Sequence, residues 1–588
     1  MLIVPVAGVL PVAIAWLTKL LIDELAVQAA PTCLLGLAAG LSMITVVMAA
    51  TPHLMQYLRA QMDRRVGVFA QDRLFRTVNE FVGLGRFEDP RFLDRLQLAQ
   101  QIAGTSPYPN QVIEGLLGTL RAALTIGGML GSLTLLDPLS AVLVLSSGVP
   151  VLVAEVALSR RRAQMLHAIV PIERRELFYS MLLSSVEAAK EVRLFSIGTF
   201  LRQRMLQNRR SADASKRALD QREVLIQTGL GLTSALVSGG GLLWAVYLAR
   251  AGDLSIGAVA LFVAAVAGVQ GALATMASEV SRAHQALAMF SHYLAVTTAG
   301  PDLPTAGVPR ALPPLHRGIE LRDVWFRYSN DTPWVLRGVS LRIEHGEALA
   351  VVGLNGAGKS TLVKLLCRFY DPTRGAILWD GIDLREVAPE ALRQRVSAVF
   401  QDYMHYHLSA AENIAVGDLT ALTDAQRITS AARRAGIHGT LTALPHGYDT
   451  LLSRMFFTET EKSEPDTGIV LSGGQWQRLA LARAFLRAQC DLVILDEPSA
   501  GLDAAAEYDI HSSLKRYRGQ RTSLLISHRL SAVRDADRIV VLSSGRLVEQ
   551  GSHTALMANG GPYAHLFTLQ AAGYEATAHH APDDQEQS

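Results

Sequence analysis

The sequence predicts two domains of different fold class, an α-helical membrane domain followed by an α/β domain. Three observations lead to this prediction. Hydrophobic residues make up 49% of the 588 residues and charged residues only 18%, whereas soluble domains carry about 25% charged residues. Six apolar runs precede residue 280, and a glycine-rich loop at residues 353–361 lies between a strand-like and a helix-like pattern. A chain of this length is expected to hold two or three domains.

The apolar runs predict six membrane-spanning helices in the first half of the chain. A span needs about 20 predominantly apolar residues, and spanning helices tolerate internal glycines and Pro150. A single run of this kind could be a buried core helix, but six in one half of a chain indicate a membrane domain. The runs cover residues 2–22, 33–55, 112–136, 139–158, 224–249 and 256–277.

The connections between these runs differ in length and charge, and the difference predicts their orientation. Residues 53–113 hold 8 Lys and Arg and residues 159–222 hold 14, whereas the three short connections together hold only Arg250. The positive-inside rule therefore places both long connections and both termini in the cytoplasm. Helical spacing predicts that the spans extend into the cytosol as helices, with turns near residues 87–90 and 196–200 that dock on a cytosolic domain. Solvated, charged loops are the alternative.

Two charged residues, Arg121 and Glu155, lie inside apolar runs at similar depth from the cytosolic ends. A charge at the centre of a bilayer costs roughly 2.5–3.5 kcal/mol on insertion scales and usually faces a partner or a bundle interior. We expect the two residues to pair or to line a water-filled cavity. The alternative is that both lie in the cytosolic extensions, where water solvates them.

A proline-rich stretch separates the two predicted domains. We expect a membrane domain at residues 1–297, a linker at 298–318, an α/β domain at 319–573 and a disordered polar tail at 574–588. The formal net charge of +2 is nearly neutral, which argues against a polyanionic partner such as nucleic acid. The three cysteines form neither a metal-binding pattern nor a disulfide framework.

Residues 353–361, hereafter the phosphate loop, read Gly-Leu-Asn-Gly-Ala-Gly-Lys-Ser-Thr. Glycines allow backbone N–H groups to converge on an anion, and the N-terminus of the following helix adds a favourable dipole. Lys359 would reach the β- and γ-phosphates of a nucleotide, and the Ser360 hydroxyl would bind Mg²⁺. Taken alone, the motif could also be a chance glycine-rich turn.

Further stretches supply other parts of a nucleotide site. Asp496 and Glu497 end an apolar, strand-like run, which places Asp496 to hold Mg²⁺ and Glu497 to polarise an attacking water. Residues 471–475 form a second glycine-rich turn that opens a helical pattern, so they provide a second anion-binding helix N-terminus. His528 follows another apolar strand, and a lone histidine there would more often be structural than catalytic.

Together these stretches resemble the ATP-binding cassette of ABC transporters, which have a P-loop NTPase fold. With the six preceding spans, nearly the full chain resembles a half-size ABC exporter subunit. Each motif occurs in the order that the family has. The matches are Tyr328 for the aromatic residue that stacks on adenine, residues 353–361 for Walker A, Gln401 for the Q-loop, residues 471–475 for the signature motif, Asp496 for Walker B, Glu497 for the catalytic glutamate, residues 499–503 for the D-loop and His528 for the switch histidine.

The resemblance implies an ATPase that uses ATP and Mg²⁺ and works as a pair with a second copy of itself or a closely related half-transporter. Each ATP would lie between one chain's Walker A loop and the other chain's signature motif. It implies catalytic roles for Glu497, His528 and Gln401, and contacts to Mg²⁺ from Ser360, Gln401 and Asp496. The implied nucleotide-binding residues are Tyr328, Gly353, Asn355, Gly356, Gly358, Lys359, Ser360, Thr361, Ser472, Gly473, Gly474 and Gln475.

The implied function is export of a hydrophobic or amphipathic substrate from the cytoplasm across the cell membrane. Small molecules, lipids and peptides all remain open as substrates, and export of a peptide or natural product without processing is one alternative. A non-transporting ABC channel or regulator is another. Two features depart from the family pattern. Residues 452–469 are longer than the usual short segment before the signature motif. The first span starts at Met1, so we expect either that the usual amphipathic elbow helix precedes this start or that it is absent.

Overall fold

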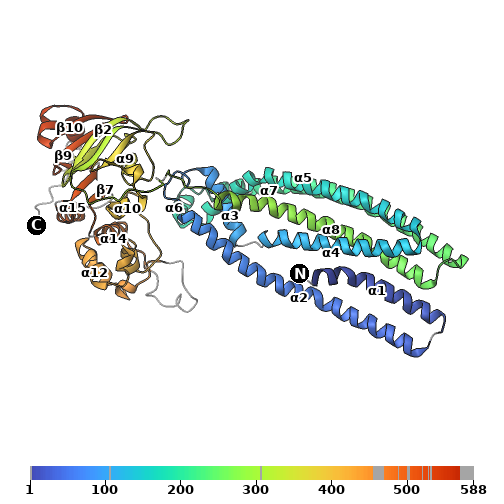
Figure 1. Ribbon diagram of the computed structural model, residues 1–588. Coiled ribbons are helices and arrows are strands. Elements are labelled where there is room, and N and C mark those ends of the chain that lie inside the picture. Colours follow the sequence, from blue (N-terminus) through green and yellow to red (C-terminus); the bar gives the residue numbers. More distant parts are fainter. Residues whose placement is uncertain are drawn as a thin grey trace, which may run out of the picture. The chain divides into compact units, whose positions relative to one another are not determined.

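The protein forms two compact units in a computed structural model (Figure 1). Unit 1 comprises Met1–Asn79 and Arg91–Ala299, and unit 2 comprises Glu80–Pro90 and Gly300–Ser588. Each unit is described by itself. The structure describes residues 3–28, 30–104, 108–304, 307–453, 469–487, 489–498, 504–519, 521–527, 529 and 533–569.

The regular secondary structure described in unit 1 is all helical, and four of its helices are far longer than a membrane requires (Figure 1). About 20 residues suffice to cross a bilayer, yet α2, α5, α7 and α8 have 49, 47, 54 and 42 residues. The predicted helical extensions of the spans are therefore present. The helices are α1 (Ile3–Ala26), α2 (Pro31–Asn79), α3 (Pro90–Gly104), α4 (Tyr108–Leu136), α5 (Pro138–Ser184), α6 (Val186–Leu194), α7 (Gly198–Ala251) and α8 (Ile256–Thr297).

In the described part of the chain, 5 helices are long and apolar enough to cross a membrane, one fewer than the six predicted spans. These helices are α1, α2, α4, α7 and α8, and each contains one predicted run. The remaining predicted run, residues 139–158, lies in α5, where several side chains fall outside the described set. The run is helical as predicted, but it does not add to this count.

Helices α4 and α8 pack closely because glycines of α4 face α8. A Cβ atom at Gly115 would lie 2.6 Å from the Cβ of Ala283, and one at Gly118 would lie 2.7 Å from the side chain of Glu279. Small residues of this kind let membrane helices approach until their backbones are in van der Waals contact. A hydrophobic core of unit 1 is formed by α1, α4, α5, α7 and α8. It includes Ala15, Met129, Leu133, Val144, Ala245, Leu261, Phe262 and Val269.

Unit 2 is an α/β fold built on two sheets, as predicted. The six-stranded sheet has the order β10-β9-β3-β8-β7-β6, and all of its neighbouring strands are parallel except β10 and β9. The four-stranded sheet, β2-β1-β4-β5, is antiparallel. Every residue of β3 and β7 is buried, which is typical of central parallel strands covered on both faces.

The elements of unit 2 have the following bounds. The strands are β1 (Gly318–Phe326), β2 (Leu336–Glu344), β3 (Ala348–Val352), β4 (Arg374–Trp379), β5 (Ile382–Asp383), β6 (Val396–Val399), β7 (Leu492–Asp496), β8 (Thr522–Ile526), β9 (Arg538–Ser543) and β10 (Arg546–Gly551). The α-helices are α9 (Lys359–Leu366), α10 (Pro389–Gln394), α11 (Ala410–Ala415), α12 (Ala425–Arg434), α13 (His438–Thr442), α14 (Gly473–Leu486), α15 (Ala504–Arg518) and α17 (His553–Ala558).

The segment Glu80–Pro90 leaves α2 and packs on the α/β fold of unit 2. The Asp302 carboxylate accepts hydrogen bonds from the backbone N–H groups of Val82 and Gly83, at 3.0 and 2.7 Å. A Cβ atom at Gly83 would lie 2.8 Å from the same carboxylate, so glycine is needed for this close approach. The predicted turn at residues 87–90 lies at the end of this segment.

Candidate nucleotide-binding site

The phosphate loop joins β3 to α9 in a conformation that requires glycine. Gly353, Gly356 and Gly358 have φ angles of 153°, 78° and 106°, a region that other residues rarely adopt. A Cβ atom at Gly353 would lie 2.3 Å from the carbonyl oxygen of Leu542, and one at Gly358 would lie 2.7 Å from the Leu336 side chain. The glycines therefore serve both the turn and its close approach to neighbouring strands.

A cavity of about 480 Å³ lies over this loop. Gln401 and Glu497, which are 96 residues apart, meet there: the Gln401 Nε2 donates a hydrogen bond to the Glu497 Oε2 at 2.9 Å. They come together because they follow β6 and β7, whose carboxyl ends share an edge of the sheet with that of β3. The cavity is lined by Val335, Asn355, Gly356, Gly358, Lys359, Ser360, Thr361, Gln401 and Glu497. Val335 was not predicted as a site residue, because it belongs to none of the motifs.

The Lys359 side chain folds back over the phosphate loop. Its Nζ donates to the carbonyl oxygens of Gly353 at 2.8 Å and Leu354 at 3.1 Å, and the residue is only 7% exposed. Burial lowers the pKa of Lys359, and the charges of Glu497 and Asp496 partly oppose that shift. An ammonium group held by neutral carbonyls in a low-dielectric site can gain strongly from an anionic partner such as phosphate.

Asp496 ends β7 with a buried carboxylate that has spare acceptor capacity. The residue is 5% exposed, and its Oδ1 has no hydrogen-bond partner in the described structure. Burial raises the pKa of Asp496, and a hydrogen bond from Ser360 partly opposes that shift. A buried oxygen without a donor, beside a hydroxyl, fits a hard cation such as Mg²⁺, which binds through one or two protein oxygens plus substrate phosphates. Among the described residues, there is no cluster of three or more His, Cys, Asp or Glu side chains that could hold a metal ion by itself.

Glu497 has a φ angle of 51°, in the left-handed region. Its backbone N–H donates to the carbonyl oxygen of Ile526 at 2.9 Å, which holds it against β8. Such backbone strain costs of order 1–3 kcal/mol and persists where the surrounding structure imposes it, often at functional sites. The strained turn aims the carboxylate away from β7 and into the cavity.

Tyr328 lies beside the phosphate loop with part of its ring accessible. Its hydroxyl is 3.0 Å from the Thr361 Oγ1, the ring meets Tyr370 edge to face, and it is 40% exposed. The Lys364 Nζ lies 5.2 Å from the ring centroid. Sequence reasoning missed Lys364 and Tyr370, because neither belongs to a motif. A partly exposed aromatic ring at this place can stack on a nucleotide base.

The second glycine-rich turn opens α14 and is separate from the cavity. Ser472 accepts from the Gln475 N–H at 3.4 Å, and the Gln475 Oε1 accepts from the Ser472 N–H at 2.8 Å. This capping box leaves the N–H groups of Gly473 and Gly474 at the helix N-terminus. None of the described residues of this turn lines the cavity over the phosphate loop of the same chain.

Three predicted parts lie outside the described residues. They are His528, the predicted D-loop at residues 499–503, and residues 454–468 of the atypical segment before the signature motif.

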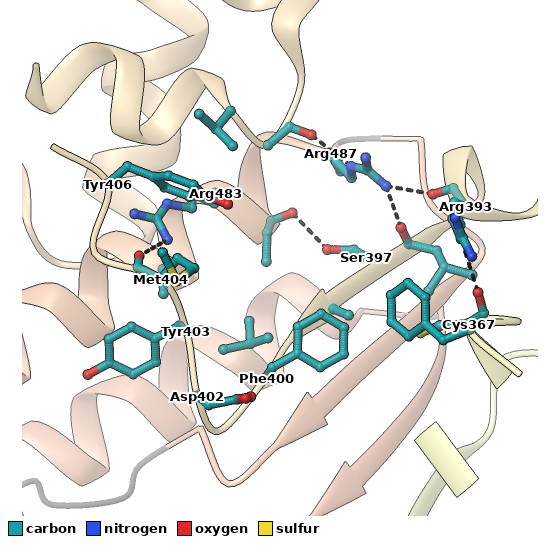
Figure 2. A pocket seen from close by; sticks show the side chains of 18 residues that line it. Cys367, Arg393, Ser397, Phe400, Asp402, Tyr403, Met404, Tyr406, Arg483 and Arg487 are labelled. Carbon is teal, nitrogen blue, oxygen red and sulfur yellow. Dashed lines mark hydrogen bonds between the residues drawn. The ribbon is translucent and has the colours of Figure 1, made fainter. Parts of the chain in front are cut away.

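A second cavity in unit 2, of about 370 Å³, follows the Q-loop (Figure 2). The Arg483 NH1 donates to the Met404 carbonyl oxygen at 2.7 Å, and its guanidinium lies 4.8 Å from the Tyr406 ring centroid. Burial lowers the pKa of Arg483 to about 10. Phe369 and Tyr403 add apolar surface to the same cavity. Arginine and aromatic side chains of this kind are enriched where proteins bind other proteins.

Comparison with known proteins finds a family model that matches part of the α/β unit. Residues 336–500 match the family model described as "ABC transporter". Among curated proteins, the chain is 42% identical to the ATP-dependent lipid A-core flippase of Chromohalobacter salexigens over 43% of this chain and 41% of the relative. It is 39% identical to the putative multidrug export ATP-binding/permease protein YgaD of Bacillus subtilis, over 43% and 41% of the two chains. The matches thus span about two fifths of the length of these relatives.

A solved structure matches over the whole chain. It is a bacterial Atm1-family ABC exporter with ATP bound, with a TM-score of 0.77, 24% sequence identity and coverage of 100% of this chain and 98% of that one. At this identity the likeness concerns the fold. The chain therefore has the fold of that exporter, a helical membrane-type domain followed by an α/β domain, which confirms the fold class predicted from the sequence.

Proposed function

We propose that this chain, which joins an ABC transporter domain to helices with an ABC exporter fold, is one half of an ATP-driven exporter. The observation that carries this proposal is the convergence of Lys359, the Gln401–Glu497 pair and the buried Asp496 at the phosphate loop. These groups are what a phosphoryl-transfer site needs: a cation for the phosphates, a metal ligand and a carboxylate for water.

In the proposed site, the loop N–H groups and Lys359 bind the phosphates, and Tyr328 stacks on adenine. Ser360, Gln401 and Asp496 would hold Mg²⁺, which neutralises charge on the β- and γ-phosphates when bound. Glu497 orients a water molecule and takes its proton as that water attacks the γ-phosphate. Gln401 already touches Glu497, so it can couple the state of the phosphates to the Q-loop. His528, which matches the switch histidine of the family, is proposed to stabilise the γ-phosphate.

The site is incomplete in one chain, which supports a working pair. The turn at residues 472–475 presents backbone N–H groups at a helix N-terminus, yet none of its residues is among those that line its own chain's cavity in the described structure. We infer that it closes the site of a second copy or a closely related half-transporter. ATP would then hold two cassettes together by occupying both half-sites, and binding energy would shift the spans between inward- and outward-open states.

The second cavity of unit 2 is the proposed receptor for the turn at residues 196–200 of the paired chain. Leu194, Phe195 and Phe200 are 77%, 63% and 53% exposed in one chain. Large apolar side chains clustered at a turn are expected to gain from burial against aromatic residues. Together with Glu80–Pro90, this contact would transmit movement of the cassette to the spans. In this arrangement the cassette lies on the cytoplasmic side of the membrane.

Transport itself is the test of this function. We expect inside-out vesicles containing the protein to accumulate a fluorescent phospholipid or amphiphilic dye only with ATP and Mg²⁺. Vesicles with Glu497→Gln are the matched control and should accumulate neither. Equal movement in both directions on ATP addition would instead identify a channel, and ATP hydrolysis without any accumulation across a broad panel would contradict export.

A separate prediction concerns Glu88, at the end of the segment that packs on unit 2. Lys364 donates to it at 2.7 Å, and Tyr370 also donates to it. Burial alone would raise the pKa of Glu88, but these hydrogen bonds outweigh burial and lower it. The contact therefore contributes above the unfolded-state pKa and is lost as pH falls through the folded-state pKa.

We expect Glu88→Ala to lower the number of substrate molecules moved per ATP hydrolysed, with basal ATPase activity retained. Because the Glu88 side chain is 41% exposed, the stability cost should stay below about 1 kcal/mol. Parallel transport and phosphate-release assays measure the ratio, with Glu80→Ala in the same segment as the control. An unchanged ratio would show that this contact does not carry the coupling.

A further inference from the structure

Unit 1 contains two adjoining cavities that are lined by arginines of its apolar helices. The larger cavity, of about 540 Å³, is lined by Arg59 of α2, Arg121 of α4, and Arg282 and Glu279 of α8. The smaller one, of about 130 Å³, shares Met55, Arg59 and Arg121 with it. Both open around the same guanidinium groups.

Two of the three arginines have carboxylate partners. The Arg59 Nε lies 3.2 Å from the Glu114 Oε1, and the Arg282 NH2 lies 2.5 Å from the Glu279 Oε1. Glu279 is 6% exposed and is held against α4 where Gly118 leaves room for it. Its position next to Arg282 is therefore set by helix packing.

Arg121 has no ion pair or side-chain hydrogen bond among the residues that the structure describes, although it lies in the candidate span Gln111–Leu136. The side chain of Glu155, its expected partner, is outside the described set. Asp63, about one turn from Arg59 on α2, lines neither cavity. An arginine stays charged even in an apolar setting, so a counter-ion from outside the chain would gain strongly there.

The smaller cavity provides an apolar surface next to the place where such a counter-ion would bind. Apart from Arg59, Glu114 and Arg121, its wall is apolar or small, so it can take a hydrocarbon group next to the guanidinium. The remaining lining residues are Val4, Met55, Leu58, Met62, Ile113, Leu117 and Gly118.

We propose that Arg121 binds the acidic head group of an anionic amphiphile, a phosphate or carboxylate, and that the smaller cavity takes part of its apolar chain. The planar guanidinium fork matches both acids through paired hydrogen bonds. The inference rests on the proposed export function and deepens it, because it names the substrate class. Ser278 in the larger cavity can supply a further donor to the head group.

Binding without ATP tests the site independently of transport. Native mass spectrometry of the full chain would compare phosphatidic acid, phosphatidylcholine and inorganic phosphate. We expect phosphatidic acid to bind the most tightly, and Arg121→Gln to weaken it about tenfold or more, as loss of a charge-assisted hydrogen bond does. Arg121→Lys should keep only part of the affinity, because lysine retains the charge but not the planar fork. Arg250→Gln, at the C-terminal end of α7, should keep all of it.

Ser278→Asp provides a second test, because it places a carboxylate inside the cavity as an internal counter-ion. We expect it to abolish the preference for phosphatidic acid over phosphatidylcholine. Equal binding of the two lipids to the unaltered chain, or full affinity in both Arg121→Gln and Ser278→Asp, would overturn the proposal. Inorganic phosphate binding as tightly as phosphatidic acid would overturn its amphiphile part. Transport can fail without changing any of these results.

Discussion

Glu497→Gln is expected to reduce the rate of ATP hydrolysis by about 10²- to 10⁴-fold, the range of a general base, while ATP still binds. The amide keeps the shape and the contact with Gln401, 2.9 Å away, but it cannot take a proton from water. The left-handed backbone at φ 51° is unaffected, because it does not depend on the side-chain charge. Phosphate release from protein in lipid nanodiscs measures the rate, and nucleotide binding is measured at equilibrium.

Glu344→Gln is the matched control, since this glutamate forms an exposed ion pair with Arg342 on the same domain. It should hydrolyse ATP at the unaltered rate. If Glu497→Gln also hydrolysed ATP at that rate, the assignment of Glu497 as the base would be wrong. The role of Asp496 and Ser360 would then need to be tested on its own.

Lys359→Ala is expected to weaken ATP binding about 10- to 100-fold, because a charge-assisted hydrogen bond contributes about 1.5–3 kcal/mol and tenfold in affinity corresponds to about 1.4 kcal/mol. The side chain is 7% exposed and its Nζ lies against the loop carbonyls. The phosphates would lose the only side-chain ammonium among the described residues that line this cavity. Equilibrium titration with a fluorescent ATP analogue measures the loss.

Lys515→Ala serves as the control for Lys359→Ala, since Lys515 pairs with Asp535 at an exposed site of the same unit. A thermal melt of each variant separates lost binding from lost folding. Unchanged affinity in a folded Lys359→Ala protein would show that the loop does not hold the phosphates in the proposed way.

Much of the architecture was predictable because it depends on local patterns. Apolar runs of about 20 residues marked the helices of unit 1, and their count differs only for residues 139–158, within α5. The phosphate loop was recognisable because its turn requires positive φ angles, such as 106° at Gly358, which glycine adopts readily. Asp496 and Glu497 were recognisable because two carboxylates directly follow a buried strand.

Contacts between distant residues were not predictable in the same way. No pattern in the sequence pairs Asp302 with the N–H groups of Val82 and Gly83, which lie 220 and 219 positions earlier in the chain. Nor does any pattern place Arg121 and Arg282, which are 161 positions apart, in the lining of one cavity. Such neighbours depend on helix packing and on loop paths, which single-sequence periodicity does not encode.

The sequence by itself therefore determined the element types, the phosphate loop and the candidate catalytic carboxylate, since these follow from residue type and spacing along the chain. Only the tertiary structure decided that Gln401 meets Glu497, that the turn at residues 472–475 stays apart from its own chain's cavity, and that Arg121 faces a cavity among α2, α4 and α8. The physical reason is that strand order and helix packing bring distant side chains together, and these depend on the whole chain burying its apolar surface at once.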